Sequence, residues 1–174
     1  MHVVDLGGTP RFWRAAPVRP ARVTVINLLP EVADEPWIDS RPGDALDRLE
    51  GHFDIAFSNS LIEHLPRAAR TRFAENVERS AALHWVQTPN RHFPIEPHWL
   101  FPGVQYMPRS ARGWLARKWP ASNFVGIPEE VVEAEVANIE LLTAGQLAEL
   151  FPGSEIWRER LGPLTKSLVA IRDQ

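Results

Sequence analysis

Short, nearly continuous apolar runs alternate with amphipathic segments along the first half of the chain. The apolar runs predict strands at 3–6, 23–28, 37–39, 53–57 and 83–87. Helical spacing predicts a short helix near 12–15, a helical turn through 46–49 and a helix over 66–81. This alternation is typical of a mostly parallel sheet with helices on both faces.

The end of the sequence has a different pattern. Thr143 with Gln146 predicts a capping box at the start of a further helix. The segments 155–160 and 166–171 then flank Gly162–Pro163. Two strands joined by so tight a turn must be antiparallel. We therefore expect an α/β fold in which an antiparallel C-terminal strand closes the parallel sheet.

A proline-rich stretch at about 89–142 separates these two parts, and we interpret it as an insertion within a single domain spanning 1–174. Short helices are expected in it around 110–118 and 128–138. The stretch follows a parallel strand, so it should arch over the edge where such sheets bind ligands. Its tryptophans either line a substrate pocket or form the small core of a lid.

Composition narrows the class of protein. The 174 residues are enough for one domain, and the net charge of −3 gives no strong field to attract nucleic acid or an anionic membrane. The absence of cysteine excludes disulfides and thiolate metal sites. No apolar run reaches membrane-spanning length, and the first residues do not read as a signal peptide. A cytoplasmic protein without nucleic-acid partners is therefore expected.

Small and polar residues stand at the carboxyl ends of the first and fourth predicted strands, where open α/β sheets hold ligands. They are Asp5, Gly7, Gly8 and Thr9 at the end of the first strand and Ser58 and Asn59 at the end of the fourth. Asn27 ends the second predicted strand, and Asp44 and Ala45 follow the third. The glycines let backbone approach a ligand, and a helix start offers free N–H groups to an anion. Structural roles remain open as alternatives: the glycines can serve the turn alone, and Asp44 can be a helix cap.

Three residues are candidates for catalysis. His64, just after the fourth strand, is either a general base or a packed, hydrogen-bonded histidine. Glu96 and His98 lie in a polar, proline-stiffened loop after the fifth strand and are candidates for a base or for positioning a substrate. His92 lies in the same loop, but the spacing of these side chains matches no metal template, so no metal is expected. The alternative is that the loop only pins the insertion to the sheet.

Several strings resemble the class I S-adenosylmethionine (SAM)-dependent methyltransferases, in particular the type 11-like group. They are Asp5-Leu6-Gly7-Gly8-Thr9 with Trp13, Ser58-Asn59-Ser60-Leu61-Ile62-Glu63-His64, and Gln87-Thr88-Pro89-Asn90 with Phe93-Pro94-Ile95-Glu96 and His98. The resemblance implies a Rossmann-like methyltransferase sheet with S-adenosyl-L-methionine as cofactor. It further implies the glycine loop at the methionine end of SAM, Asn27 at the ribose, and Asp44 with Ala45 at the adenine. The implied activity is transfer of a methyl group to an oxygen or nitrogen of a small-molecule or glycan-type acceptor, whose identity the strings do not specify.

The sequence departs from the family pattern in three places. Members usually have Asp or Glu where Asn27 stands, further glycines where Thr9, Pro10 and Arg11 stand, and one or two helices before the first strand. These departures favour a second hypothesis, a non-catalytic methyltransferase-like module that acts as a partner or regulatory subunit. We also expect either a truncated start or a homodimer or partner that covers the face those helices would occupy. A nicotinamide-dependent dehydrogenase is a third, disfavoured reading, because the glycine pattern does not suit dinucleotide binding.

Overall fold

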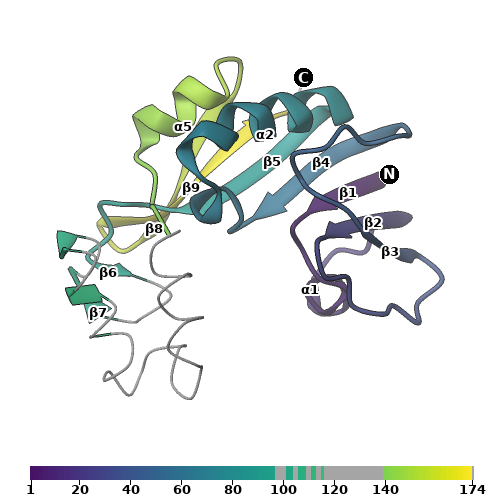
Figure 1. Ribbon diagram of the computed structural model, residues 1–174, viewed down its shortest axis with the longest axis horizontal. Helices are drawn as coiled ribbons and strands as arrows, with labels where there is room; N and C mark the ends of the chain where they lie inside the picture. Colours follow the sequence, from purple (N-terminus) through teal and green to yellow (C-terminus); the bar gives the residue numbers. More distant parts are fainter. Residues whose placement is uncertain (97–100, 104–105, 109–110, 113–114, 116–138, 174) are drawn as a thin grey trace.

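A computed structural model describes residues 1–96, 101–103, 106–108, 111–112, 115 and 139–173. Within these residues one seven-stranded sheet forms the centre of the fold (Figure 1). Its strands, in spatial order, are β3 (Ile38–Pro42), β2 (Arg22–Asn27), β1 (His2–Leu6), β4 (Phe53–Asn59), β5 (Ala81–Pro89), β9 (Leu164–Arg172) and β8 (Glu155–Leu161). The first five are parallel, whereas β9 runs antiparallel to both β5 and β8. The predicted parallel sheet with an antiparallel C-terminal pair is confirmed.

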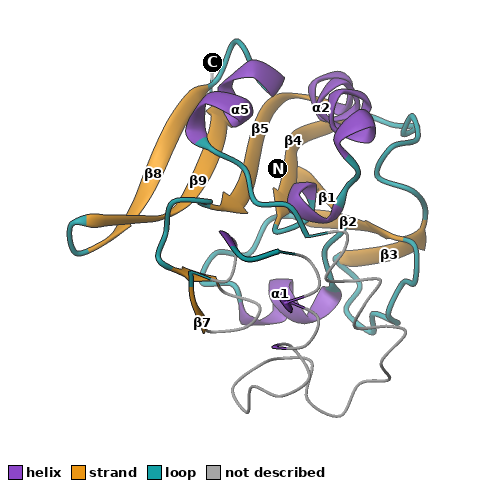
Figure 2. Ribbon diagram, turned by 60° about the vertical axis from the view of Figure 1, so that its left-hand side comes forward, coloured by secondary structure: helices purple, strands orange, loops and turns teal. Residues whose placement is uncertain are grey.

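Helices lie on both faces of the sheet, as predicted. Helices α2 (Arg67–Ser80) and α5 (Ala144–Leu150) lie on one face, and the short α1 (Pro10–Ala15) lies on the other (Figures 1 and 2). Neighbouring residues of β1 confirm the two layers, because Val4 packs in the core under α2 whereas Val3 packs in the core under α1. Every second side chain of a strand points to the same face. Both cores are therefore built by the nearly continuous apolar runs.

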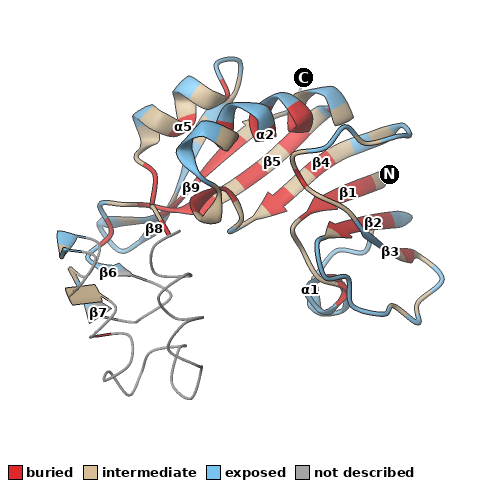
Figure 3. Cartoon of the chain, in the orientation of Figure 1, coloured by how far each residue is buried: buried red, intermediate tan, exposed pale blue. Residues whose placement is uncertain are grey.

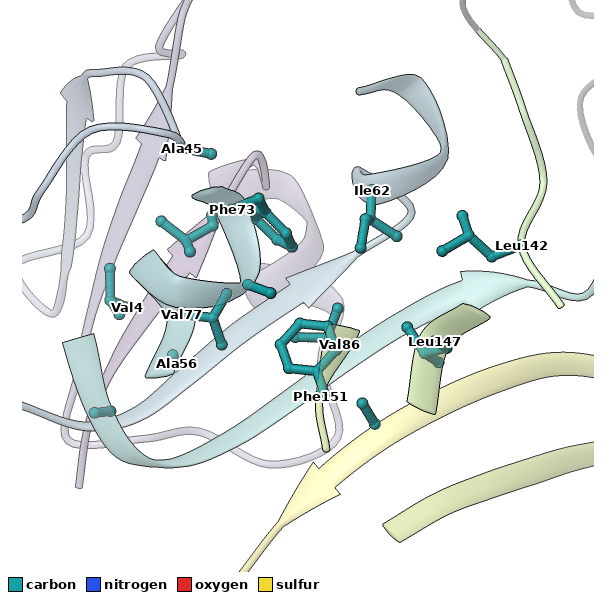
Figure 4. Packing of buried hydrophobic residues seen from close by; sticks show 14 of the residues in the cluster. Val4, Ala45, Ala56, Ile62, Phe73, Val77, Val86, Leu142, Leu147 and Phe151 are labelled. Carbon is teal, nitrogen blue, oxygen red and sulfur yellow. The ribbon is translucent and has the colours of Figure 1, made fainter. Parts of the chain in front are cut away.

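The larger core lies between the central strands and α2 and α5 (Figures 3 and 4). Phe73 and Phe151 are completely buried in it, from α2 and from the end of α5. Burying one such side chain stabilises the fold by about 2 to 3 kcal/mol. The predicted capping box at α5 is present: Gln146 N donates to Thr143 Oγ1 at 3.3 Å, and Thr143 N donates to Gln146 Oε1 at 2.9 Å.

Several boundaries differ from the prediction for local reasons. The third strand occupies Ile38–Pro42 instead of 37–39. No helix forms over 46–49, where a turn at Ala45 and Leu46 follows an Asp44 side chain that accepts the Leu46 N–H. The closing strands are longer than predicted because only Gly162 and Pro163 separate them, with Gly162 in the left-handed region at a φ of 59°.

Both ends of the proline-rich stretch lie at the carboxyl end of β5. Asn90 forms a β-bridge with Leu142, and Arg91 N donates to Leu142 O at 3.0 Å. A short antiparallel pair, β6 (Ile95–Glu96) and β7 (Phe101–Pro102), follows β5. Most of the residues predicted as short helices at 110–118, and all of those at 128–138, lie outside the described residues. In the part of the chain that is described, no helix is long and apolar enough to cross a membrane.

Candidate ligand site at the carboxyl edge of the sheet

The carboxyl ends of β1, β2 and β3 and the turn after β4 surround one cavity of about 160 Å³. The chain crosses from β3 over β2 and β1 to reach β4, so the cavity lies beside the point where the strand order reverses. Open α/β sheets bind ligands at this point. The lining residues are Gly7, Ile26, Asn27, Leu28, Gly43, Asp44, Ala45, Leu61 and Leu65. Gly7, Asn27, Asp44 and Ala45 were predicted from sequence as ligand-binding residues.

A wider cavity of about 570 Å³ lies at the opposite edge, at the amino ends of β4 and β5. Its lining includes His52, Phe53, Ser80 and Ala81, and none of the predicted site residues. Size alone would favour it. The smaller cavity remains the candidate site, because the carboxyl edge carries the turns and polar side chains with which a parallel sheet binds ligands.

Each glycine of the first loop leaves space that another side chain of the protein fills. Gly7 has a φ of +80°, and a Cβ built on it would lie 2.8 Å from both terminal methyl groups of Leu61. A Cβ on Gly8 would lie 1.8 Å from Oδ2 of Asp5. The structural alternative noted for these glycines therefore has direct support. Gly7 also lines the cavity, so its backbone can serve both the turn and contact with a ligand.

Asp5 lies behind the loop and does not line the cavity. Its residue is 1% exposed, and Trp13 Nε1 donates a hydrogen bond of 2.7 Å to Oδ2. The second oxygen, Oδ1, is buried without a hydrogen-bond partner among the described residues. Burial raises the pKa of the Asp5 carboxyl to about 7, although the Trp13 hydrogen bond acts in the opposite direction. This carboxyl therefore titrates near neutral pH.

The Asn27 side chain forms hydrogen bonds with the backbone of the glycine loop after β1 and with the backbone just after its own strand, β2. Its Nδ2 donates to Gly8 O at 2.9 Å and to Gly7 O at 3.3 Å. Its Oδ1 accepts the N–H of Leu29 at 3.2 Å. An amide oxygen has two lone pairs, so Oδ1 retains capacity for one more hydrogen bond.

Asp44 takes the capping role that was the structural alternative. Its Oδ1 accepts the N–H of Leu46 at 2.9 Å and so stabilises the turn after β3. Its other carboxylate oxygen makes no hydrogen bond within the described residues. Ala45 is buried, and its carbonyl accepts a hydrogen bond of 2.8 Å from Asn76 Nδ2 on α2. The cavity wall formed by Asp44 and Ala45 is thus anchored both locally and to α2.

Ser58 does not face the cavity. It is 1% exposed, and its hydroxyl donates to Leu6 O at 2.9 Å, which ties β4 to β1. Asn59 is partly exposed and accepts a hydrogen bond from Ser60 Oγ at 3.3 Å. Ser60 has a φ of 56°, an uncommon value for a residue other than glycine. This left-handed turn carries the chain from β4 to Leu61, which reaches the cavity.

The candidates for catalysis are only partly described. His64 ends a 3-10 helix, η1 (Ile62–His64), and does not line the cavity. Its neighbour Glu63 is fully buried and accepts a hydrogen bond of 3.0 Å from Thr88 Oγ1 on β5. Glu96 belongs to β6, but its side chain is outside the described part, and His98 lies outside the described residues altogether.

Sequence reasoning missed the apolar part of the site. Ile26, Leu28, Leu61 and Leu65 all line the cavity beside the polar residues. The signal was present, because each is next to or near a residue at a predicted strand end. Thr9 was predicted as a binding residue, but it stands at the N-cap of α1 without a side-chain cap hydrogen bond and does not line the cavity.

No family model matches this sequence, and no curated protein matches it. Solved structures with a similar fold include human N-acetylserotonin methyltransferase in complex with SAM, at a TM-score of 0.56 and 12% identity over 99% of this chain. The DhpI–SAH complex (SAH is S-adenosylhomocysteine) has a TM-score of 0.59 and 13% identity over 98% of this chain and 74% of DhpI. The pyocyanin biosynthetic protein PhzM has a TM-score of 0.51 and 19% identity.

The chain spans about half the length of two of these structures, because it covers 48% of the N-acetylserotonin methyltransferase and 50% of PhzM. At these identities the likeness concerns the fold. The chain thus shares its Rossmann-like fold, a mostly parallel sheet with an antiparallel closing pair, with these solved structures.

Proposed function

We propose that this chain binds SAM at the cavity between β1, β2 and β3 and is a methyltransferase for a small-molecule or glycan-type acceptor. The observation that carries the proposal is convergence: four predicted residues from three separate stretches of sequence line one cavity, namely Gly7, Asn27, and Asp44 with Ala45. Solved structures that share the fold include complexes with SAM and SAH.

The residues present suit an adenosine group. Ile26, Leu28 and Ala45 offer apolar surface to a flat ring. The open carboxylate oxygen of Asp44 can accept from an exocyclic amino group, and Oδ1 of Asn27 can accept from one ribose hydroxyl. The fit therefore combines an apolar slot with a few polar groups that fix orientation.

Bound SAM would supply an activated methyl group on a sulfonium, and the protein would supply position and electrostatics. Gly7 and Asn27 would hold the cofactor at the strand ends. An acceptor hydroxyl needs a base to take its proton, for which His64, Glu96 and His98 are the candidates. An anionic acceptor or an amine needs no strong base. We further propose a cytoplasmic location and no nucleic-acid partner. We also propose that the proline-rich stretch at about 89–142 contributes to the binding site of the acceptor.

One observation favours the alternative of a non-catalytic module. Of the three candidate bases, only His64 has a described side chain, and His64 does not line the cavity. Such a module would bind SAM weakly or not at all and would act through a partner or a second copy of the chain.

Calorimetric titration with SAM, SAH and NAD tests the proposal. We expect micromolar binding of SAM and SAH and none of NAD. The Asp44→Asn variant keeps an oxygen that can accept the Leu46 N–H but loses the charge, so its affinity for SAH should fall about tenfold or more. Asp47→Asn is the matched control, because Asp47 is exposed, pairs with Arg72 and does not line this cavity.

Methyl transfer from labelled SAM to a panel of hydroxyl and amine acceptors separates the enzyme from the module. SAM binding with no turnover on any acceptor, together with co-purification of a partner, would favour the module. No binding of SAM or SAH by the folded chain rejects both the cofactor and the enzyme.

A further inference from the structure

One residue, Asn27, links three strand ends around the candidate cavity through its side chain and its backbone carbonyl. Asn27 Nδ2 donates to the carbonyls of Gly7 and Gly8, and Oδ1 accepts the N–H of Leu29. The backbone carbonyl of Asn27 also accepts the N–H of Gly43 at 3.0 Å. The ends of β1, β2 and β3 thus meet at this one residue.

The orientation of the Asn27 amide follows from its partners. A backbone carbonyl only accepts hydrogen bonds, so the side-chain atom that faces Gly7 O and Gly8 O must be the nitrogen. A backbone N–H only donates, so the atom that faces Leu29 N must be the oxygen. A flipped amide would lose all three hydrogen bonds.

A carboxylate at this position would face the same two carbonyls without a proton to donate. Aspartate has the same shape as asparagine, so one of its oxygens would replace a nitrogen that lies 2.9 Å and 3.3 Å from carbonyl oxygens. Two hydrogen bonds would become repulsive contacts. The observed loop conformation therefore needs an amide.

We propose that Asn27 is a positioning residue whose side-chain amide locks the Gly7–Gly8 loop to β2. An acidic side chain at this position could accept a hydrogen bond from a ribose, but it could not donate to the loop, so the lock requires an amide. Under the proposed function, on which only the ligand part of this inference rests, the ribose meets a neutral acceptor on a loop that is already ordered. The amide determines the shape of the cavity before the ligand arrives.

Two variants separate the lock from simple ribose acceptance. Asn27→Asp keeps the shape and any acceptor role but cannot donate, whereas Asn27→Ala removes both. Asn59→Asp is the matched control, because Asn59 ends the neighbouring strand β4 and the change adds the same charge at the same edge. Within the described residues the Asn59 side chain only accepts, through Oδ1 from Ser60 Oγ, so the change removes no donated hydrogen bond.

The first measurement needs no ligand. Hydrogen exchange of the Gly7 amide, which donates to Ile26 O at 2.8 Å, and of the Phe12 amide, which donates to Thr9 O at 3.1 Å, reports order in the loop and at the start of α1. We expect exchange at least tenfold faster in Asn27→Asp and Asn27→Ala than in the parent and in Asn59→Asp. Exchange within twofold of the parent in both Asn27 variants overturns the lock.

The second measurement is the affinity for SAH. The lock predicts that Asn27→Asp binds at least as weakly as Asn27→Ala, about tenfold below the parent. Ribose acceptance alone predicts the opposite order, with Asn27→Asp equal to or tighter than the parent, and that order overturns the inference. If the parent chain does not bind SAH, the proposed function fails, whereas the exchange measurement still decides the lock.

Discussion

Trp13 and Asp5 are joined side chain to side chain across the glycine loop, by a hydrogen bond of 2.7 Å from Nε1 to Oδ2. Asp5 belongs to β1 and Trp13 to α1, so the bond closes the loop between the strand and the helix. Trp13 packs in addition against the ring of Phe57 at 5.2 Å. The loop at the candidate site is therefore held from behind by a buried acid whose pKa is raised to about 7.

Asp5 makes the stability of the fold depend on pH between about 4 and 7. In this interval the folded protein keeps the proton on Asp5 that the unfolded chain releases, because burial raises the pKa from 3.8 to about 7. This contribution is complete below pH 4 and is lost as the pH rises to 7. One pKa unit corresponds to about 1.4 kcal/mol, so we expect a loss of roughly 2 to 4 kcal/mol.

Urea denaturation at a series of pH values from about 4 to 8 measures this loss of unfolding free energy. The Asp5→Asn variant has no such proton, so the difference in unfolding free energy between variant and parent should shift in favour of the variant as the pH rises. The exposed Asp34→Asn change is the control and should leave the pH profile unaltered. A profile that Asp5→Asn leaves unaltered would contradict the burial argument.

Gly8 and Asp5 should be coupled in a double-mutant cycle. Gly8→Ala alone places a methyl group 1.8 Å from Asp5 Oδ2, so it should destabilise the fold by about 2 kcal/mol or more. In an Asp5→Ala background the obstructing carboxylate is gone, and the same change should cost less than half as much. Chemical denaturation of the four proteins gives the interaction free energy. Additive effects would mean that Gly8 is needed for another reason.

His84 should give the opposite dependence on pH. It is buried on β5, its Nε2 lies 2.7 Å from Ser154 Oγ, and burial followed by the charge of Arg172 lowers its pKa from 6.5 to about 4. The unfolded chain binds a proton in this interval and the folded protein does not, so stability falls as the pH drops from 6.5 to 4. We expect a loss of about 1 to 2 kcal/mol, reduced by solvent screening from an upper limit of roughly 3 kcal/mol.

The His84→Gln variant tests this assignment, because its amide can still bond Ser154 but does not titrate. Its unfolding free energy, relative to the parent, should improve between pH 6.5 and pH 4. His52→Gln, at an exposed position, serves as the control. The two opposing slopes from Asp5 and His84 overlap, so each is visible only through its own variant.

Ser58 should prove structural. Removing its hydroxyl in Ser58→Ala leaves the buried carbonyl of Leu6 without its side-chain partner and should lower stability by about 1 kcal/mol. Because the hydroxyl points to β1 and not to the cavity, the affinity for SAH should change by less than about threefold, roughly 0.6 kcal/mol. Calorimetry and thermal unfolding together decide it. A large loss of affinity at unchanged stability would return Ser58 to the binding residues.

The fold was predictable because its signals are local. The capping box at Thr143 depends on residues three apart, and the closing turn depends on Gly162 with Pro163, so neither needs knowledge of the rest of the chain. The continuous apolar runs indicated strands covered on both faces, and the alternation of Val3 and Val4 between two cores bears this out.

The sequence predicted where the site residues lie in the sheet better than it predicted where their side chains point. Sequence located the strand ends that meet at the cavity, but the partner of each side chain depends on which strand lies beside it. Ser58 points to Leu6 because β4 lies beside β1, and Asn27 reaches Gly8 because β2 lies beside β1. For Ser58 a signal existed, because strand periodicity puts it on the same face as the buried Ala56.

The position of β9 between β5 and β8 has a consequence for the order of assembly. Strand β9 is translated after every other strand of the sheet, yet it pairs with residues 84–89 of β5 and with residues 155–161 of β8. Until β9 is inserted, β5 presents an open edge of unpaired N–H and C=O groups, which is a template for pairing with other chains. A nascent chain whose β9 is still inside the ribosome should therefore be the form most in need of chaperone protection.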